Sequence, residues 1–215
     1  MTLVCFAVKE EAVPFRERAA SLSQVEILLT GIGPRNAEKA IREALAARKP
    51  KLVLSCGFAG GLRPGLESGT VVFSAEPDTG LEAVLLSAGA HRGTFHCVAK
   101  VATSAEQKRE LWKTTGADAV EMESQIICAV CRNQSVPTAI VRVILDTADE
   151  DLPLDFNQLM NARQEMSYGK LALALVKSPG KVEPLRRLQR QSKAAAEKLA
   201  QVLVAALNGI IPENP

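Results

Sequence analysis

Short runs of apolar residues alternate with longer, more charged segments along most of the chain. Such runs are typical of strands buried on both faces, and we expect strands at residues 3–7, 25–29, 52–54 and 139–145, with further strands in "TVVFSAE" and "RGTFHCVAKVA". Helices are expected between them, at residues 9–22, 36–47 and 105–114. The alternation predicts an α/β fold of three layers, with a central mixed, largely parallel sheet flanked by helices.

The ends of the predicted strands carry acids and glycines. They are Glu10-Glu11, Gly31-Ile32-Gly33, Ser55-Cys56-Gly57, Glu121-Met122-Glu123 and Asp146. Ligands of such sheets bind outside the carboxyl ends of the strands, so these acids and two predicted glycine loops are expected to meet at one edge. The stretch "AVEMES" at residues 119–124 has two interpretations. Its acids either stabilise the first turn of a helix, or one of them binds hydroxyl groups in a pocket.

Composition indicates an ordinary globular protein. The chain has 215 residues, of which 47% are hydrophobic and 23% charged, and this predicts a single domain over residues 1–215. A net charge of +2 gives no reason to expect a nucleic-acid partner. Three charged residues lie within "MTLVCFAVKEE", and the five cysteines are an odd number. We therefore expect no export signal and a cytoplasmic location with reduced thiols.

Neither the cysteines nor the histidines indicate a metal site. Cys128 and Cys131 form a C-x-x-C pair, but they lie in a predicted apolar helix without a second pair of ligands. His96 and Cys97 are neighbours on a predicted strand, where adjacent side chains point to opposite faces. We expect no metal and no cofactor.

The segment at about residues 178–208 is predicted to be helical and basic. Apolar residues recur on one helical face, at Val182, Leu185, Leu188, Ala195, Leu199, Val202 and Ala206. The favoured interpretation is a terminal helix that packs this face on the core. The second interpretation is a reversible contact with an anionic membrane surface, made through Lys181, Arg186, Arg187, Arg190, Lys193 and Lys198.

Five segments, in order, carry a resemblance to a known family: "AVKEEAVPF", "TGIGPRNA", "SCGFAGGL", "AVEMES" and "VRVILDTADED". Together they resemble the nucleoside phosphorylase and nucleosidase superfamily, and most of all the methylthioadenosine/S-adenosylhomocysteine nucleosidases. The resemblance covers residues 3–160. It implies an enzyme that cleaves the N-glycosidic bond of a small-molecule purine nucleoside, with adenine as the base and a modified 5′ group. It also implies a homodimer.

The resemblance assigns roles to five residues. Asp146 matches the acid that protonates N7 of the leaving purine, and a buried carboxyl has the raised pKa that this role requires. Glu11 matches the base that takes a proton from the attacking water. Glu123 matches the acceptor of hydrogen bonds from the ribose hydroxyls, a charge-assisted interaction. Met122 would pack against the sugar, and Arg142 would orient the acids, which leaves Glu121 with a structural role.

Six further positions match residues around the substrate. Ile32 and Phe156 would line the pocket for the 5′ substituent, although ordinary core packing explains them equally well. The full set of six is Val8, Ile32, Ser55, Gly57, Phe58 and Phe156. Phe58 replaces a small hydroxyl residue, and Val8 stands where the nucleosidases often carry methionine. The segment before "TSAEQKRE" is shorter than in the nucleosidases, and their base-stacking aromatic residue has no counterpart here.

The substrate and the nucleophile are less sharply defined by the sequence. "SCGFAGGL", the short middle segment and the basic C-terminal segment resemble the hopanoid-associated phosphorylases, which implies adenosylhopane as a substrate. Phosphorolysis needs an anion site, but Lys9-Glu10-Glu11 replaces the phosphorylases' glycine-and-arginine loop, and Leu52 replaces one of their arginines. We therefore predict hydrolysis. The sequence is also compatible with a phosphorolytic enzyme, with a futalosine-type hydrolase that releases hypoxanthine, and with a non-catalytic nucleoside-binding module.

Overall fold

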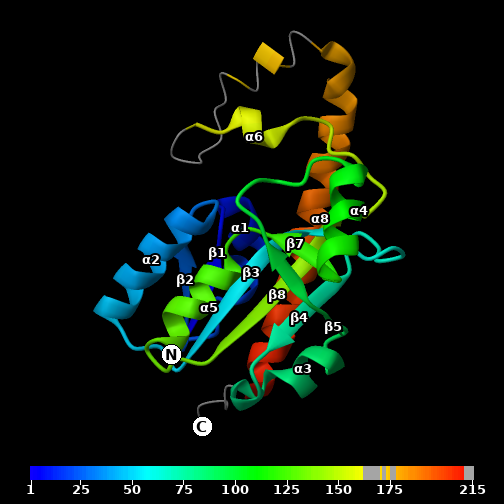
Figure 1. Ribbon diagram of the computed structural model, residues 1–215. Coiled ribbons are helices and arrows are strands. Elements are labelled where there is room, and N and C mark those ends of the chain that lie inside the picture. Colours follow the sequence, from blue (N-terminus) through cyan, green and yellow to red (C-terminus); the bar gives the residue numbers. More distant parts are fainter. Residues whose placement is uncertain (162–169, 171–172, 175–177, 211–215) are drawn as a thin grey trace.

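The computed structural model describes residues 1–161, 170, 173–174 and 178–210. Its centre is a twisted sheet with the strand order β2-β1-β3-β8-β4-β5 (Figure 1). The pairs β1–β2, β1–β3, β3–β8 and β4–β5 are parallel, whereas β4 runs antiparallel to β8. These strands are β1 (Thr2–Phe6), β2 (Val25–Leu29), β3 (Leu52–Gly61), β4 (Val71–Ala75), β5 (His91–Arg92) and β8 (Thr138–Asp146).

Two short strands join the sheet at the end of β3. They are β6 (Phe95–Cys97) and β7 (Ala119–Glu121). β7 pairs antiparallel with Gly60 and Gly61 of β3 and parallel with β6. The acidic stretch that follows β7 is thereby brought to the carboxyl edge of the main sheet.

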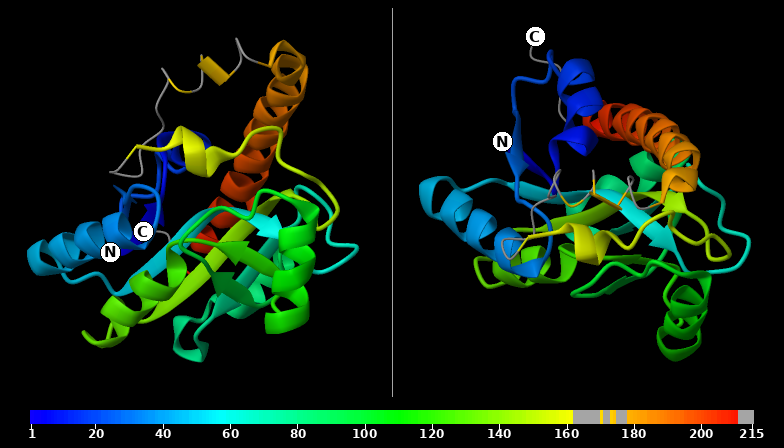
Figure 2. Two further views of the ribbon diagram at one scale, coloured as in Figure 1. Left: turned by 45° about the horizontal axis from the view of Figure 1, so that its top comes forward. Right: turned by 90° about the horizontal axis from the view of Figure 1, so that it is seen from above.

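Helices cover both faces of the sheet (Figures 1 and 2). α2 and α5 pack together on one face, and α1, α3 and α8 share the other face. The helices are α1 (Lys9–Arg18), α2 (Pro34–Ala47), α3 (Leu81–Ser87), α4 (Ala105–Thr115), α5 (Ser124–Arg132), α6 (Phe156–Leu159) and α8 (Val182–Ile210), with 3-10 turns η1 (Pro77–Thr79) and η2 (Pro179–Lys181).

β1 shows why its sequence is continuously apolar. Val4 and Phe6 point into the core under α1 and α8, whereas Leu3 and Cys5 point into the core under α2 and α5. Successive strand residues face opposite sides, so a strand between two helical layers must be apolar at every position. The predicted three-layer α/β fold with a mixed, largely parallel sheet is confirmed.

The predicted glycine loop after residues 52–54 was wrong, because β3 continues as a strand to Gly61. β8 pairs with it from Val53 to Gly60, with an irregularity between Ala59 and Gly60. The glycines of this segment therefore lie within a strand and do not form a loop. Glycine in a strand often marks a place where another group approaches the backbone closely. In addition, α1 ends at Arg18 and not at Leu22, and "RGTFHCVAKVA" is a strand only at β5 and β6.

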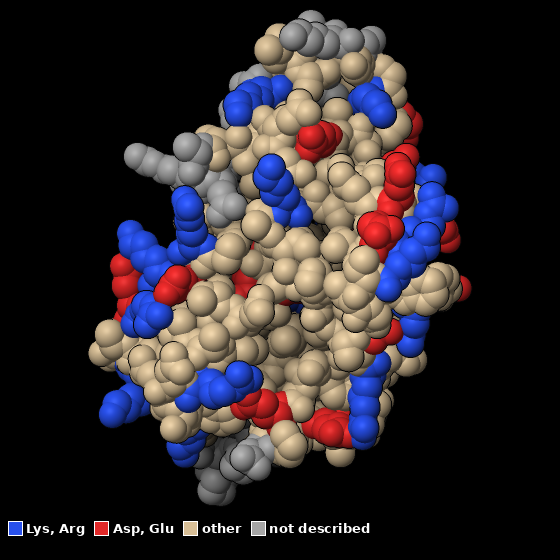
Figure 3. Space-filling model, in the orientation of Figure 1, with Lys and Arg blue, Asp and Glu red and all other residues tan. Residues whose placement is uncertain are grey.

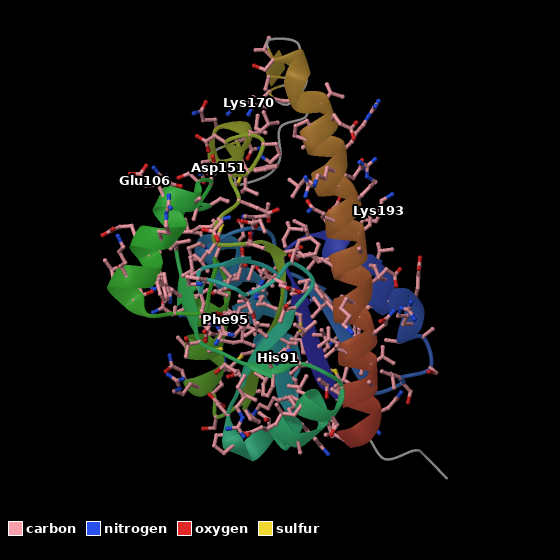
Figure 4. All side chains as sticks on the ribbon, turned by 90° about the vertical axis from the view of Figure 1, so that its right-hand side faces the viewer. His91, Phe95, Glu106, Asp151, Lys170 and Lys193 are labelled. Carbon is pink, nitrogen blue, oxygen red and sulfur yellow. The ribbon has the colours of Figure 1, made fainter. Side chains whose placement is uncertain are left out.

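The long helix α8 divides into two parts. Its apolar face from Ala195 to Leu207 is buried against the sheet, α1 and α3, as the core-packing interpretation predicted. The part before Ala195 projects past the sheet (Figure 1). The exposed side chain of Lys193 points away from the rest of the molecule (Figure 4). A membrane contact remains a prediction for this first part alone. In the described part of the chain, no helix has both the length and the apolar character needed to cross a membrane.

Candidate active site

Arg142 of β8 is the centre of a buried group of charges. Its Nη2 lies 2.6 Å from Glu121 Oε2 and 3.4 Å from Glu123 Oε2, and it donates to Ser55 Oγ at 3.1 Å. The arginine is 1% exposed. Burial alone would lower the pKa of Arg142, but the neighbouring acids raise it by more than burial lowers it. The guanidinium therefore stays charged. Removing either the arginine or its acids would leave a buried charge without a partner, which is strongly destabilising.

Glu121 is the structural acid of the group. Its Oε2 accepts from the backbone N–H groups of Glu123 at 3.0 Å and Ser124 at 2.8 Å, and its Oε1 accepts from the Ser124 hydroxyl at 2.6 Å and from the Cys97 thiol. Burial tends to raise its pKa, but Arg142 and these donors lower it below its ordinary value. Its oxygens are thus used in holding the turn from β7 into α5.

Glu123 lies two residues further on and has other partners. Its Oε1 accepts from the N–H of Gly33 at 2.8 Å, where the "TGIG" loop enters α2. Burial raises its pKa above the ordinary value, with Arg142 acting in the opposite direction. A carboxylate has about four acceptor positions, so these contacts leave it able to accept hydroxyl groups. Met122, 9% exposed, lies between the two acids in sequence.

Glu11 approaches the group from the first turn of α1. Its Oε2 accepts from the N–H groups of Ala7 at 3.0 Å and Val8 at 3.2 Å, and its Oε1 accepts from the N–H of Phe58 at 2.8 Å. Burial raises its pKa to about 7, although Arg142 and these N–H donors act to lower it. A carboxyl with this pKa is partly ionised near neutral pH, as a general base should be.

Gly57 shows how closely these groups meet. A Cβ atom at this position would lie 2.6 Å from Glu11 Oε1 and 2.8 Å from Arg142 Nη1, and the residue has a φ of +144°. Both the space and the backbone conformation therefore require glycine. The glycine of "SCGFAGGL" lets Glu11 and Arg142 approach each other across β3.

Gly57→Ala is expected to lower turnover by on the order of 10²-fold, because the new methyl group must displace Glu11 by a sizeable fraction of an ångström. Backbone strain should also lower the free energy of unfolding by about 1–3 kcal/mol. Steady-state kinetics and thermal unfolding measure the two effects. Gly180→Ala is the matched control, because a Cβ at Gly180 meets nothing within 4 Å. Equal turnover in both variants would contradict the close approach.

Asp146 ends β8, further along the same pair of strands. It is 8% exposed and lies opposite Gly60, three residues beyond Gly57 on β3. That spacing places it about 10 Å along the strand from the Gly57 position. Burial raises the pKa of Asp146, while the ammonium of Lys108, with which it forms an ion pair, acts to lower it. Asp146 thus stands apart from the Arg142 group but at the same edge.

The remaining predicted pocket residues lie around this edge. Ser55 is 1% exposed and its hydroxyl accepts from Arg142, so it supports the arginine and does not face open space. Phe58 meets Glu11 through its N–H, whereas its ring packs on the core beneath α1 and α8. Ile32 lies in the loop before α2, where its carbonyl accepts from Asn36. Phe156 is half-buried at the start of α6.

Figure 3 shows a depression near the middle of the face turned to the viewer, among mostly uncharged side chains. A cavity of about 330 Å³ borders Asp146, between the loop after β8 and the beginning of α8. Lys181 and Arg187 of the C-terminal segment are among the residues that line it. Among the described residues, no group of three or more histidines, cysteines and acids is placed to hold a metal ion.

Comparisons with known proteins give the family. A family profile described as "Phosphorylase superfamily" matches residues 12–84 and 73–177. The chain belongs to the phosphorylase superfamily. It is 27% identical over 188 residues to a 5'-methylthioadenosine/S-adenosylhomocysteine nucleosidase of Exiguobacterium, covering 72% of this chain and 80% of that protein. These matches confirm the class expected from the sequence, an enzyme of the nucleoside phosphorylase and nucleosidase superfamily.

Solved structures show the same fold. The futalosine hydrolase of Helicobacter pylori superposes with a TM-score of 0.70 at 16% identity, covering 97% of each chain. A 5'-methylthioadenosine/S-adenosylhomocysteine nucleosidase of Neisseria meningitidis, solved in complex with methylthio-immucillin-A, also gives a TM-score of 0.70, at 20% identity and covering 97% of this chain and 99% of that one. These identities support the fold alone.

Proposed function

We propose that the protein hydrolyses the N-glycosidic bond of a purine nucleoside that carries a modified 5′ group. The observation that carries the proposal is Glu11, a buried carboxyl with a pKa of about 7, beside the Arg142–Glu123 pair. Asp146 is a second buried acid at the same edge, and burial raises its pKa. Two carboxyls with separate environments suit a reaction that needs both an acid and a base.

The proposed mechanism uses each group at a stated atom. Glu11 takes a proton from a water molecule that attacks C1′ of the ribose. Asp146 gives a proton to N7 of the purine, so the base leaves as a neutral molecule as the bond from C1′ to the base nitrogen breaks. Glu123 accepts hydrogen bonds from the 2′- and 3′-hydroxyls. The water oxygen becomes the new hydroxyl on C1′, and the products are a free purine and a free sugar.

The charge of the site supports an electron-poor sugar in the transition state. Glu11, Glu121 and Glu123 surround one guanidinium. When ionised, these three acids exceed the single cation by two charges. An oxocarbenium-like ribose carries positive charge, so fixed negative charge around it lowers the barrier. Burial is the main cause of the raised pKa values of Glu11 and Glu123, and repulsion from a neighbouring acid adds to it in each case. A positive charge that develops beside these carboxyls would favour their ionised forms.

Purine release is expected to proceed at the same rate in phosphate-free buffer and in buffer with added phosphate. Carboxylates beside Arg142 would repel a phosphate dianion, and Leu52 is a buried apolar residue of β3. Mass spectrometry of the sugar product is the measurement. Formation of a sugar 1-phosphate, with a rate that saturates in phosphate, would show that the enzyme is a phosphorylase.

The relatives suggest which nucleosides to test first. 5′-Methylthioadenosine and S-adenosylhomocysteine would release adenine, whereas a futalosine-type substrate would release hypoxanthine, so the released base separates the two activities. A protein that binds these nucleosides without releasing a base would be a non-catalytic binding module. A lipid-linked 5′ group such as that of adenosylhopane, a homodimer and a cytoplasmic location all remain predictions.

A further inference from the structure

The helix α4, which the structure describes in full, buries one residue, and that residue is a lysine. Lys108 is 0% exposed. Most of its neighbours in the run "AEQKRELWK" are charged or polar residues. Burying an ammonium group is strongly unfavourable unless partners replace its water, so its position calls for an explanation.

Three oxygens surround the Lys108 ammonium. It forms an ion pair with Asp146 Oδ2 and donates to the carbonyl oxygens of Thr147 at 2.8 Å and Glu150 at 2.7 Å. Two of the three N–H donors of the ammonium are thus used by backbone carbonyls, and its charge is paired with the Asp146 carboxylate. All three acceptors belong to the end of β8 and the turn that follows it. Lys108 thus ties the side chain of Asp146 and its turn to α4.

A contact that only attached α4 to the turn after β8 would not need a charged side chain at position 108. The turn already has its own contacts, because the Glu150 carboxylate accepts from the Thr147 N–H at 2.9 Å. The start of α4 is also joined to the loop, since Ala105 N–H donates to Asp151 at 2.8 Å, and Figure 4 shows Asp151 beside Glu106. A well-packed apolar side chain often stabilises as well as a buried ion pair.

We propose that Lys108 is a positioning residue, which holds the Asp146 carboxyl and the turn after β8 in the geometry for proton donation to the purine. This inference rests on the proposed function of Asp146. It concerns a residue that does not itself touch the reacting atoms and acts through the acid.

Lys108 also influences when Asp146 carries its proton. The charged groups around Asp146 are Lys108 from α4 and Glu150 from the loop, and Asp151, Lys181 and Arg187 line the adjoining cavity. Burial raises the pKa of Asp146, Lys108 lowers it and Glu150 raises it. Activity that needs the protonated acid is lost as the pH rises through this pKa. Removing the ammonium should therefore extend activity to higher pH, and removing the Glu150 charge should have the opposite effect.

The test compares Lys108→Met with Lys113→Met, an exposed lysine of the same helix. Lys108→Met is expected to lower kcat at its optimum by about 10-fold to 10²-fold through misplacement of the acid. The basic limb of its pH profile should move upward by about one pH unit or more. In an Asp146→Asn background, the same substitution should change kcat by less than about twofold. Lys113→Met should match the wild type.

Glu150→Gln provides an independent result if Lys108→Met does not fold. Its amide can still accept from Thr147, and the loss of the like charge should move the basic limb downward. The inference is overturned if neither variant moves the basic limb, or if Lys108→Met is equally damaging with and without Asp146. If Asp146→Asn itself leaves turnover unchanged, the proposed function of Asp146 fails instead, which is a separate outcome.

Discussion

Asp146→Asn is expected to lower kcat by about 10²–10⁴-fold, the range for loss of a general acid or base. Asparagine keeps the size and one acceptor oxygen of the side chain but has no carboxyl proton to give to N7. Burial raises the pKa of Asp146, which favours the protonated form that donation requires. The measurement is the rate of purine release at saturating substrate.

Asp149→Asn is the matched control, because Asp149 is an exposed acid of the same "DTADED" stretch. It should release purine at the wild-type rate. If both variants retain full turnover, Asp146 is not the acid, and the leaving purine must be protonated by another group or leave unprotonated.

Glu11→Gln is expected to have an effect of similar size, about 10²–10⁴-fold on kcat. The wild-type kcat/KM should fall as the pH drops through about 7, because Glu11 has a pKa of about 7 and must be ionised to accept a proton. This acidic limb should be absent from the variant. A pH series of kcat/KM on both proteins measures the effect.

Glu10→Gln controls for the change of an acid in the same helical turn, since Glu10 is exposed. It should keep both the rate and the acidic limb. An acidic limb that persists unchanged in Glu11→Gln would assign it to another group, and Glu123, whose pKa burial also raises, would be the first to test.

The layers of the fold could be predicted because burial on both faces makes a strand apolar throughout. β1 and β8 are buried along nearly their whole length and carry this pattern. The extent of β3 could not be predicted, because glycines in its second half weaken every local strand signal. Gly57 is required by Glu11 and Arg142, and a Cβ at Gly60 would press on Val120, all of them side chains from distant parts of the chain. Long-range contacts of this kind leave no periodic pattern.

The candidate site could also be predicted only in part. The acids at strand ends could be found, because parallel strands bring their carboxyl ends to one edge. The resemblance predicted a structural role for Glu121 and a substrate-binding role for Glu123. The contacts of Glu121 agree with its structural role. Lys108 was missed, since it lies in a mostly polar run, where a lysine is typical of the exposed side of a helix. Only the position of the turn after β8 reveals that this one residue points inward.

The most direct test of the site is a crystal structure of Asp146→Asn with the purine nucleoside that the wild-type protein cleaves fastest. We expect the 2′- and 3′-hydroxyls on Glu123, the Glu11 carboxyl facing C1′, and N7 of the purine directed at residue 146. A nucleoside whose sugar lies away from Glu123, or whose base points away from residue 146, would contradict the proposed site.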